Sequence, residues 1–509
     1  MNTVDVAVIG SGHNALVAAC YLARAGRGVE VLERDSVLGG AVSTVARFPG
    51  HRVDRGSSAH IMIRHTEILD ELDLDVRYLD CDPWAFAPAP PGSGLAPIVF
   101  RRDLARTCAA IEAACGAADA DAYRRFVEVW EPRSARVMRA FRTRPTGAGL
   151  LRSFWGLDAR GGGSALSREF LTSGNALLDG YFRDERLKAA LAWFGAQSGP
   201  PMTEPGTAPM VGFAALMHRI PPGRAVGGSG ALTEALVRRL HVDGGVTSAG
   251  DAVVELRRRG RGWLVRTAGG RELQARTVIA GCHVLTTLDL LERGGFDVEP
   301  WRRGIRVGPG VGMVVRLATS QLPTYPGATP AESATGLQLL VHDRRQLARA
   351  HDGLHAGRPP GRPAVLAMSF SAIDPTIAPR GEHQLTLWSQ WHAYDLPWPE
   401  IGNAEADRIV AELDSYAPGF RDTIRNRHVQ TPHDLETELG LRGGNVMHVE
   451  MSLDQMLLWR PTADLSGYRV PGAPGLYLTG ASTHPGGGVS GASGRSVARL
   501  VVSDQRFRR

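Results

Sequence analysis

The chain has 509 residues, of which 43% are hydrophobic and 22% are charged. These values exclude a disordered chain and a coiled coil, and the length allows two to four domains. The formal net charge is +6, but the arginines are interspersed with acids and no base-reading helix or RNA-binding aromatic motif is visible. We therefore expect no nucleic-acid partner, while a peripheral contact with anionic lipid stays open.

Hydropathy and cysteine usage predict a soluble, cytoplasmic type of protein. No apolar run approaches the roughly 18–20 residues of a membrane span, and residues 1–10 are typical of a strand rather than of a leader peptide. The cysteines form no C-x-x-C pair and no zinc-ligand spacing. We expect neither disulfides nor a metal site. The cysteines are Cys20, Cys81, Cys108, Cys115 and Cys282.

The N-terminus predicts one βαβ unit. The segment Val4–Ile9 is rich in valine and isoleucine, as expected for a parallel strand buried on both faces. A G-x-G-x-x-A turn follows at residues 10–15, and the helical stretch Leu16–Ala25 comes next. A second strand, Val29–Leu32, ends in an acidic residue, Glu33. This order of elements is typical of a dinucleotide-binding fold.

Each residue of this turn has a physical role in binding a dinucleotide. Gly10 allows the tight turn, and Gly12 lets a pyrophosphate approach the backbone. The small Ala15 lets the helix pack closely on the strand, and Asn14 lies in the same phosphate-binding turn. The phosphates would lie at the helix N-terminus, where unpaired N–H groups attract anions. Glu33 would accept hydrogen bonds from the ribose hydroxyls.

The turn alone leaves NAD and FAD open, and the next segment favours FAD. Arg34 is followed by Gly39, Gly40 and Ala41, which resembles the R-x-x-x-x-G-G extension of two-dinucleotide-binding flavoproteins. Two adjacent glycines permit a second close pass of the backbone over the diphosphate.

A resemblance to a known family extends over almost the whole chain. The sequence resembles the phytoene desaturase-like FAD oxidoreductases, in the branch named for pyridine nucleotide-disulphide oxidoreductase domain-containing protein 2. Five segments carry the resemblance, and they are Val226–Leu236, Asp374–Gly381, Gln390–Tyr394, Gly444–Gln455 and Gly480–Gly491. The last two of these segments are the most specific.

The resemblance implies further FAD contacts. A glycine-rich C-terminal turn leads into an expected helix, Ala492–Val502, whose N-terminus would stabilise negative charge at the flavin. Relatives often carry an acid after the Gly480 equivalent to hold the ribityl chain, but Ala481 follows here. The residues implied in FAD binding here are Val253, Gly480, Ala481, Gly488, Val489 and Ser490.

Two titratable residues near the C-terminus are candidates for proton transfer. His448, Glu450 and Ser452 alternate along the chain, which puts them on one face if the segment is extended. We expect Glu450 to orient the His448 imidazole and to hold its pKa near neutrality. A buried structural set of hydrogen bonds is the alternative.

Other candidates would line the flavin cavity or only pack in the core. They are His60, His484 and Tyr394, and Trp388, Trp391 and Trp398 are candidates for paving an apolar tunnel. By its resemblance to relatives, the chain has Val314 where many of them carry a lysine.

These observations predict an α/β protein with a Rossmann-like FAD domain and a mixed-sheet α+β substrate domain. We expect the FAD domain to comprise residues 1–80, 224–300 and 440–509. The substrate domain would comprise residues 81–223 and 301–439. The elements expected in it are the strands Gly312–Ala318, Ala364–Phe370 and Gln384–Gln390 and the helix Ala404–Tyr416.

The resemblance implies an FAD-dependent dehydrogenase or desaturase that takes a hydride from a C–H bond of an apolar small molecule. Only one dinucleotide turn is visible, so electrons would leave to dioxygen or a quinone rather than to NAD(P). A redox-neutral double-bond isomerase is an alternative. A flavin-free lipid- or prenyl-binding module, like the GDP dissociation inhibitors of the same fold, is an alternative of a different class.

Overall fold

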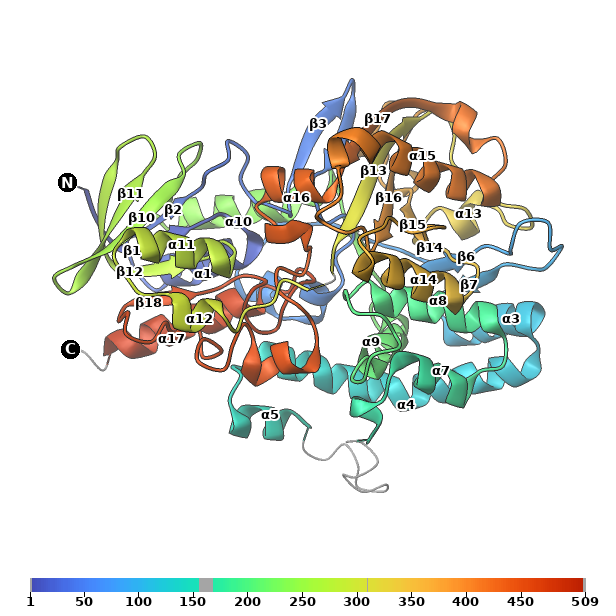
Figure 1. Ribbon diagram of the computed structural model, residues 1–509, viewed down its shortest axis with the longest axis horizontal. Coiled ribbons are helices and arrows are strands. Elements are labelled where there is room, and N and C mark those ends of the chain that lie inside the picture. The colour runs from blue at the N-terminus through green and yellow to red at the C-terminus, as the bar shows by residue number, and fades with distance from the viewer. Residues whose placement is uncertain (1, 155–167, 309, 507–509) are drawn as a thin grey trace.

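Two seven-stranded sheets organise the molecule. The computed structural model describes residues 2–154, 168–308 and 310–506. The two sheets occupy opposite ends of the molecule, and helices pack on each of them (Figure 1). Both termini lie at the end that carries the first sheet (Figure 1). The mixed α/β class predicted from the sequence is confirmed.

The first sheet has the strand order β10–β11–β12–β1–β2–β9, and β18 pairs with the last residues of β12. The strands β1, β2, β9, β12 and β18 run parallel. Their carboxyl ends therefore share one edge of the sheet. The strands are β1 (Asn2–Ile9), β2 (Val29–Leu32), β9 (Val246–Ser248), β10 (Val253–Arg259), β11 (Gly262–Thr267), β12 (Glu272–Ala280) and β18 (Leu476–Leu478).

The predicted βαβ unit is present. The strands β1 and β2 pair in parallel and are joined through helix α1 (His13–Arg24). This helix begins three residues earlier than expected, because the Gly12 carbonyl accepts the N–H of Leu16 and so closes the first turn. Three helices pack together at this position: α1, α10 (Gly230–Val242) and α17 (Ala492–Arg506).

The crossing of α1 and α17 depends on a glycine. A Cβ atom at Gly494 would lie 2.0 Å from the Asn14 carbonyl oxygen, so only glycine permits this separation of the two helices. The C-terminal helix thereby holds the first turn of α1, which carries the phosphate-binding residues predicted above.

The second sheet has the order β17–β13–β16–β15–β14–β6–β7. The three strands expected in it are present, although the one expected over 364–370 ends at Met368, because residues 370–372 form a 3-10 turn. The strands are β6 (Ala85–Ala87), β7 (Ile98–Phe100), β13 (Gly312–Thr319), β14 (Leu337–Leu340), β15 (Val365–Met368), β16 (His383–Gln390) and β17 (Ile424–Gln430).

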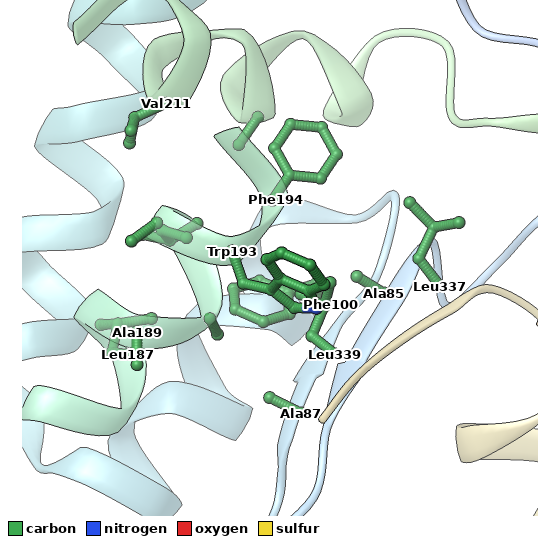
Figure 2. Close-up of a cluster of buried hydrophobic side chains, with 14 of the residues drawn as sticks. Ala85, Ala87, Phe100, Leu187, Ala189, Trp193, Phe194, Val211, Leu337 and Leu339 are labelled. Carbon is green, nitrogen blue, oxygen red and sulfur yellow. The ribbon is translucent and has the colours of Figure 1, made fainter. Parts of the chain in front are cut away.

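Helices cover both faces of the second sheet. Helix α15 (Trp398–Tyr416) packs on one face, against residues such as Val315 of β13. On the other face, Trp193 and Phe194 of α8 pack with Phe100 and with Leu337 and Leu339 of β14 (Figure 2). The helices on this other face are α3 (Leu104–Cys115), α4 (Ala117–Arg142), α7 (Gly174–Tyr181) and α8 (Glu185–Ala196).

The expected division into two discontinuous domains stays a prediction. All strands of the first sheet come from residues 1–80, 224–300 and 440–509, and all strands of the second come from 81–223 and 301–439. Residues 1, 155–167, 309 and 507–509 of those ranges lie outside the described chain. No described helix is long and apolar enough to cross a bilayer.

A buried cluster of charged side chains contains residues from both sets of ranges. Arg224 and Asp54 are nearly inaccessible to solvent, and their side chains form an ion pair. Asp54 also accepts hydrogen bonds from the Ser229 N–H and the Thr44 hydroxyl. Burial alone would raise the pKa of Asp54, but Arg224 and these donors lower it overall. Asp374 adds a second carboxylate, 3.8 Å from Arg224 Nε.

We predict that Asp54→Ala destabilises the fold by about 3–5 kcal/mol, because it leaves the Arg224 cation buried without its main partner. Urea unfolding followed by circular dichroism measures the effect. The control is Asp407→Ala, which removes the more exposed partner of Arg427 and should cost at most about 1 kcal/mol. Equal losses in both variants would contradict this assignment.

Candidate functional site

A cavity of about 770 Å³ lies at the carboxyl edge of the first sheet and extends to the second sheet. All the residues predicted to bind a dinucleotide line this cavity except Ser490. Its wall is formed at one end by glycine-rich turns and at the other by apolar side chains of β13–β16 and the helical layer. One continuous space therefore connects the predicted cofactor site with the second sheet.

The turn after β1 is shaped for close approach of an anion. Gly10 has φ +86°, and a Cβ there would lie 3.3 Å from the Cys282 nitrogen. Gly12 has φ −55°, which any residue can adopt, and a Cβ there would have none of the described protein atoms within 4 Å. The protein fold therefore does not itself require glycine at position 12, whereas a ligand lying against the backbone does.

The N-terminus of α1 has donors without protein partners. Within the described part of the chain no side chain caps this helix, and the N–H groups of its first turn have no partner. Asn14 is buried, and its Oδ1 has no hydrogen-bond partner in the described chain. His13 bonds to the Asn14 amide, and burial lowers its pKa to about 4. The N–H groups of this turn fit the diphosphate of a dinucleotide, whereas the Asn14 Oδ1 can only accept a hydrogen bond.

Glu33 connects the turns that surround the predicted diphosphate site. Its Oε2 accepts both the N–H and the hydroxyl of Ser11, each at 2.7 Å, and its Oε1 accepts the Asp35 N–H at 3.0 Å. A carboxylate offers about four acceptor positions, so one stays available for a ribose hydroxyl. The Ser11 hydroxyl oxygen also accepts the Gly39 N–H. The sequence indicates this connecting role of Ser11 only through its position inside the G-x-G turn.

The C-terminal glycine turn reaches the cavity, but its last predicted residue does not. Gly480, Gly488 and Val489 have positive φ and line the cavity. Ser490 is buried, and its hydroxyl accepts the N–H of Ala492 at the start of α17. Contrary to the prediction, Ser490 does not line the cavity, and its hydroxyl is engaged by the backbone at the start of α17.

The three side chains expected in the cavity do not line it. Both ring nitrogens of His60 are hydrogen-bonded at 2.7 Å, to the Tyr78 hydroxyl and to Ser229 Oγ. His484 Nε2 bonds the Ala140 carbonyl, and the Tyr394 ring packs on His433 at 4.7 Å. Each of these residues is held by a segment distant in sequence, so the expectation for all three is wrong.

The alternation expected for His448, Glu450 and Ser452 is also wrong. The segment is not a strand: His448 has φ +68°, and its N–H bonds the Asn445 carbonyl. The Glu450 carboxylate pairs with Arg306 at 2.7 Å and does not line the cavity. His448 does line it, and its Nδ1 lies 3.0 Å from Ser482 Oγ.

The predicted near-neutral pKa of His448 is wrong as well. Without the Glu450 carboxylate beside it, burial lowers the pKa of His448 far below its ordinary range, and His283 and Arg460 lower it further. The His448 and His283 rings stack with their centroids 5.0 Å apart. Neutral imidazole is thus the stable form in this site.

Apolar side chains form the cavity wall at the second sheet. Val314 of β13 pairs with Trp388 of β16, and both line the cavity together with Leu366 and Met368 of β15. Trp391 and Trp398 do not; their indole N–H groups bond to backbone carbonyls instead. Of the three tryptophans proposed as tunnel residues, Trp388 alone has that position.

The carboxylates that line the cavity already have partners in the protein. Asp35 pairs with Arg55 at 2.6 Å. Glu438 accepts hydrogen bonds from Arg47 and Gln430, and His428 holds its pKa down to about 2. Among the described residues no cluster of three or more histidine, cysteine or acidic side chains has the geometry of a metal site.

Comparisons with known proteins agree with this geometry. The family described as NAD(P)-binding Rossmann-like domain matches residues 8–72, which contain the end of β1 and the whole of α1 and β2. The rat pyridine nucleotide-disulfide oxidoreductase domain-containing protein 2 is 31% identical over 98% of this chain and 93% of its own length. The chain belongs to the family of this rat protein.

Two further similarities place the family in a wider group. A phytoene desaturase of Fusarium fujikuroi is 25% identical over 99% of this chain and 90% of its own. A triple mutant of putrescine oxidase, redesigned in cofactor binding, is 13% identical, covers 100% of this chain and 99% of its own, and has a TM-score of 0.64. The latter shows a shared fold. The protein is an oxidoreductase of the phytoene desaturase-like family, as its sequence predicts.

Proposed function

We propose that this protein binds FAD in the cavity and oxidises a C–H bond of an apolar substrate beside the second sheet. The observation that carries the proposal is the continuous cavity, which has glycine turns at one end and apolar side chains at the other. FAD supplies a two-electron acceptor for a hydride. The backbone of residues 10–15 and 39–41 would hold its diphosphate, and residues 480–489 would contact its flavin end.

The side chains at the second sheet favour an apolar substrate. Val314, Trp388 and Leu366 present no charge to the cavity. At the mouth, Leu171, Leu453 and Trp459 line the cavity and are also exposed, Trp459 by 50%. Exposed apolar side chains around an apolar cavity favour binding of a lipophilic molecule.

The protein contributes chiefly by positioning. Hydride transfer requires the donor carbon about 3–3.5 Å from the acceptor atom, and a rigid apolar wall excludes water from that contact. The turn at residues 10–15 would be occupied by FAD rather than by NAD(P), so we propose dioxygen or a quinone as the electron acceptor.

We predict that Gly12→Val folds normally but does not retain FAD. The Cβ of the valine would have no described protein atom within 4 Å, and the side chain would occupy the space of the pyrophosphate. Visible absorption of the purified protein and far-UV circular dichroism measure the two properties. Gly180→Val, at an exposed helix position with similar free space, is the matched control and should stay yellow. A fully flavinylated Gly12→Val protein would contradict FAD binding at this turn.

We also predict that the FAD-loaded protein does not oxidise simple polyamines. An ammonium group would lose hydration at the apolar wall around Val314, and the lining carboxylates Asp35 and Glu438 are already paired with arginines. Peroxide release from putrescine and spermidine, followed with a coupled peroxidase assay, should stay at background. Rapid turnover of either amine would refute the proposed substrate class.

A further inference from the structure

His448 is held in a strained conformation by an unusual number of contacts. Its φ of +68° costs a non-glycine residue roughly 1–3 kcal/mol. The carbonyls on either side of it, those of Met447 and Val449, both accept hydrogen bonds from Arg460. Its own carbonyl accepts one from His283 Nε2 at 2.9 Å. Such strain persists only where surrounding contacts fix it, and it is typical of functional positions.

The hydrogen bonds determine which nitrogen of His283 carries the proton. The backbone N–H of Leu285 donates to His283 Nδ1 at 3.1 Å, so Nδ1 must present a lone pair. The neutral ring therefore carries its proton on Nε2, which donates it to the His448 carbonyl. This tautomer satisfies both ring nitrogens.

The same reasoning applies to His448 through Ser482. The N–H of Val284 donates to Ser482 Oγ at 3.0 Å. Ser482 is buried and makes only one other hydrogen bond in the described chain, to His448 Nδ1. If Nδ1 carried the proton, Ser482 Oγ would receive two donors and its own hydroxyl hydrogen would have no acceptor. A buried unsatisfied hydroxyl is costly, so the hydroxyl donates to Nδ1.

His448 therefore presents its Nε2–H to the cavity. Nε2 has no hydrogen-bond partner in the described chain, it is not among the buried polar atoms closed off from solvent, and His448 is a lining residue of the cavity. We propose that His448 is a neutral hydrogen-bond donor that stabilises negative charge on a carbonyl-type oxygen of the bound ligand. This inference rests on the proposed function and reverses the proton-accepting role expected from the sequence.

The surroundings keep the donor in this form. Burial, the stacked His283 ring and the Arg460 guanidinium all disfavour a second proton on His448. Arg460 is itself fully buried, and carbonyl oxygens rather than a carboxylate accept its hydrogen bonds. Its uncompensated positive charge, like the donor, favours negative charge in the cavity. A preorganised donor of this kind typically changes a rate by about 10²–10³-fold.

The tautomer is measurable without cofactor or substrate. Protein labelled with ¹⁵N-histidine is examined at pH 7 by long-range ¹H–¹⁵N correlation, and His448→Gln identifies the His448 signals among those of the 16 histidines. We expect the neutral form with the proton on Nε2. A proton on Nδ1, or on both nitrogens, overturns the proposal. This experiment can be done even if the protein binds no FAD. A failure of the His448 proposal can therefore be distinguished from a failure of the proposed FAD binding.

A pair of serine variants tests the cause of the tautomer. Ser482→Ala should shift the His448 signals toward a mixture of the two neutral forms. Ser371→Ala is the matched control, since Ser371 is also buried beside a histidine, His383, at 3.4 Å, and it should leave the His448 signals unchanged. Unchanged His448 signals in Ser482→Ala would overturn the role of Ser482.

Sulfite binding to the FAD-loaded protein identifies the acceptor oxygen. Sulfite adds to flavin and leaves negative charge on its pyrimidine carbonyl end. If that oxygen is the acceptor, His448→Ala should weaken sulfite binding by roughly 10²-fold, while His448→Gln, which can still donate an N–H, stays within about tenfold of wild type. Equal affinities in all three proteins assign the acceptor to the substrate. Equal loss in both variants overturns donation by the Nε2–H.

Discussion

The structure depends on one constraint: the backbones of three segments distant in sequence, residues 10–15, 39–41 and 480–489, must meet around one cavity. The parallel strands β1, β2, β12 and β18 end at one edge of the first sheet, which is where open α/β sheets bind ligands. Glycines allow the turns there to approach closely, and Gly12 in particular leaves the cavity side of the turn empty. The packing of α17 on α1 through Gly494 holds this arrangement in place.

The cofactor end of the site could be predicted because its determinants are local. The turn at residues 10–15, the acid at the end of β2 and the glycines at 39–40 all act through backbone geometry that short patterns encode. The catalytic end could not be predicted in the same way. His60 and His484 are held by Ser229 and Ala140 respectively, partners more than a hundred residues away.

His448 shows the same limit most clearly. Simple alternation paired it with Glu450, but a positive φ turns the backbone and Arg306 binds that carboxylate. The partners that decide its chemistry, Ser482 and His283, lie elsewhere in the sequence. No pattern around residue 448 indicates them, so its orientation and protonation became visible only in the fold. Arg460 donates to the carbonyls on either side of His448, and no sequence pattern predicts this role.

We propose that one cavity holds FAD with its diphosphate at Gly12 and its flavin between Val314 and His448. A crystal structure of the protein reconstituted with FAD tests this most directly. We expect diphosphate density against the backbone of residues 10–15 and 39–41, with the ring system between β13 and the turn at residues 480–489. Density for the ring system outside this space, or a cavity that stays empty at saturating FAD, would contradict FAD binding in this cavity.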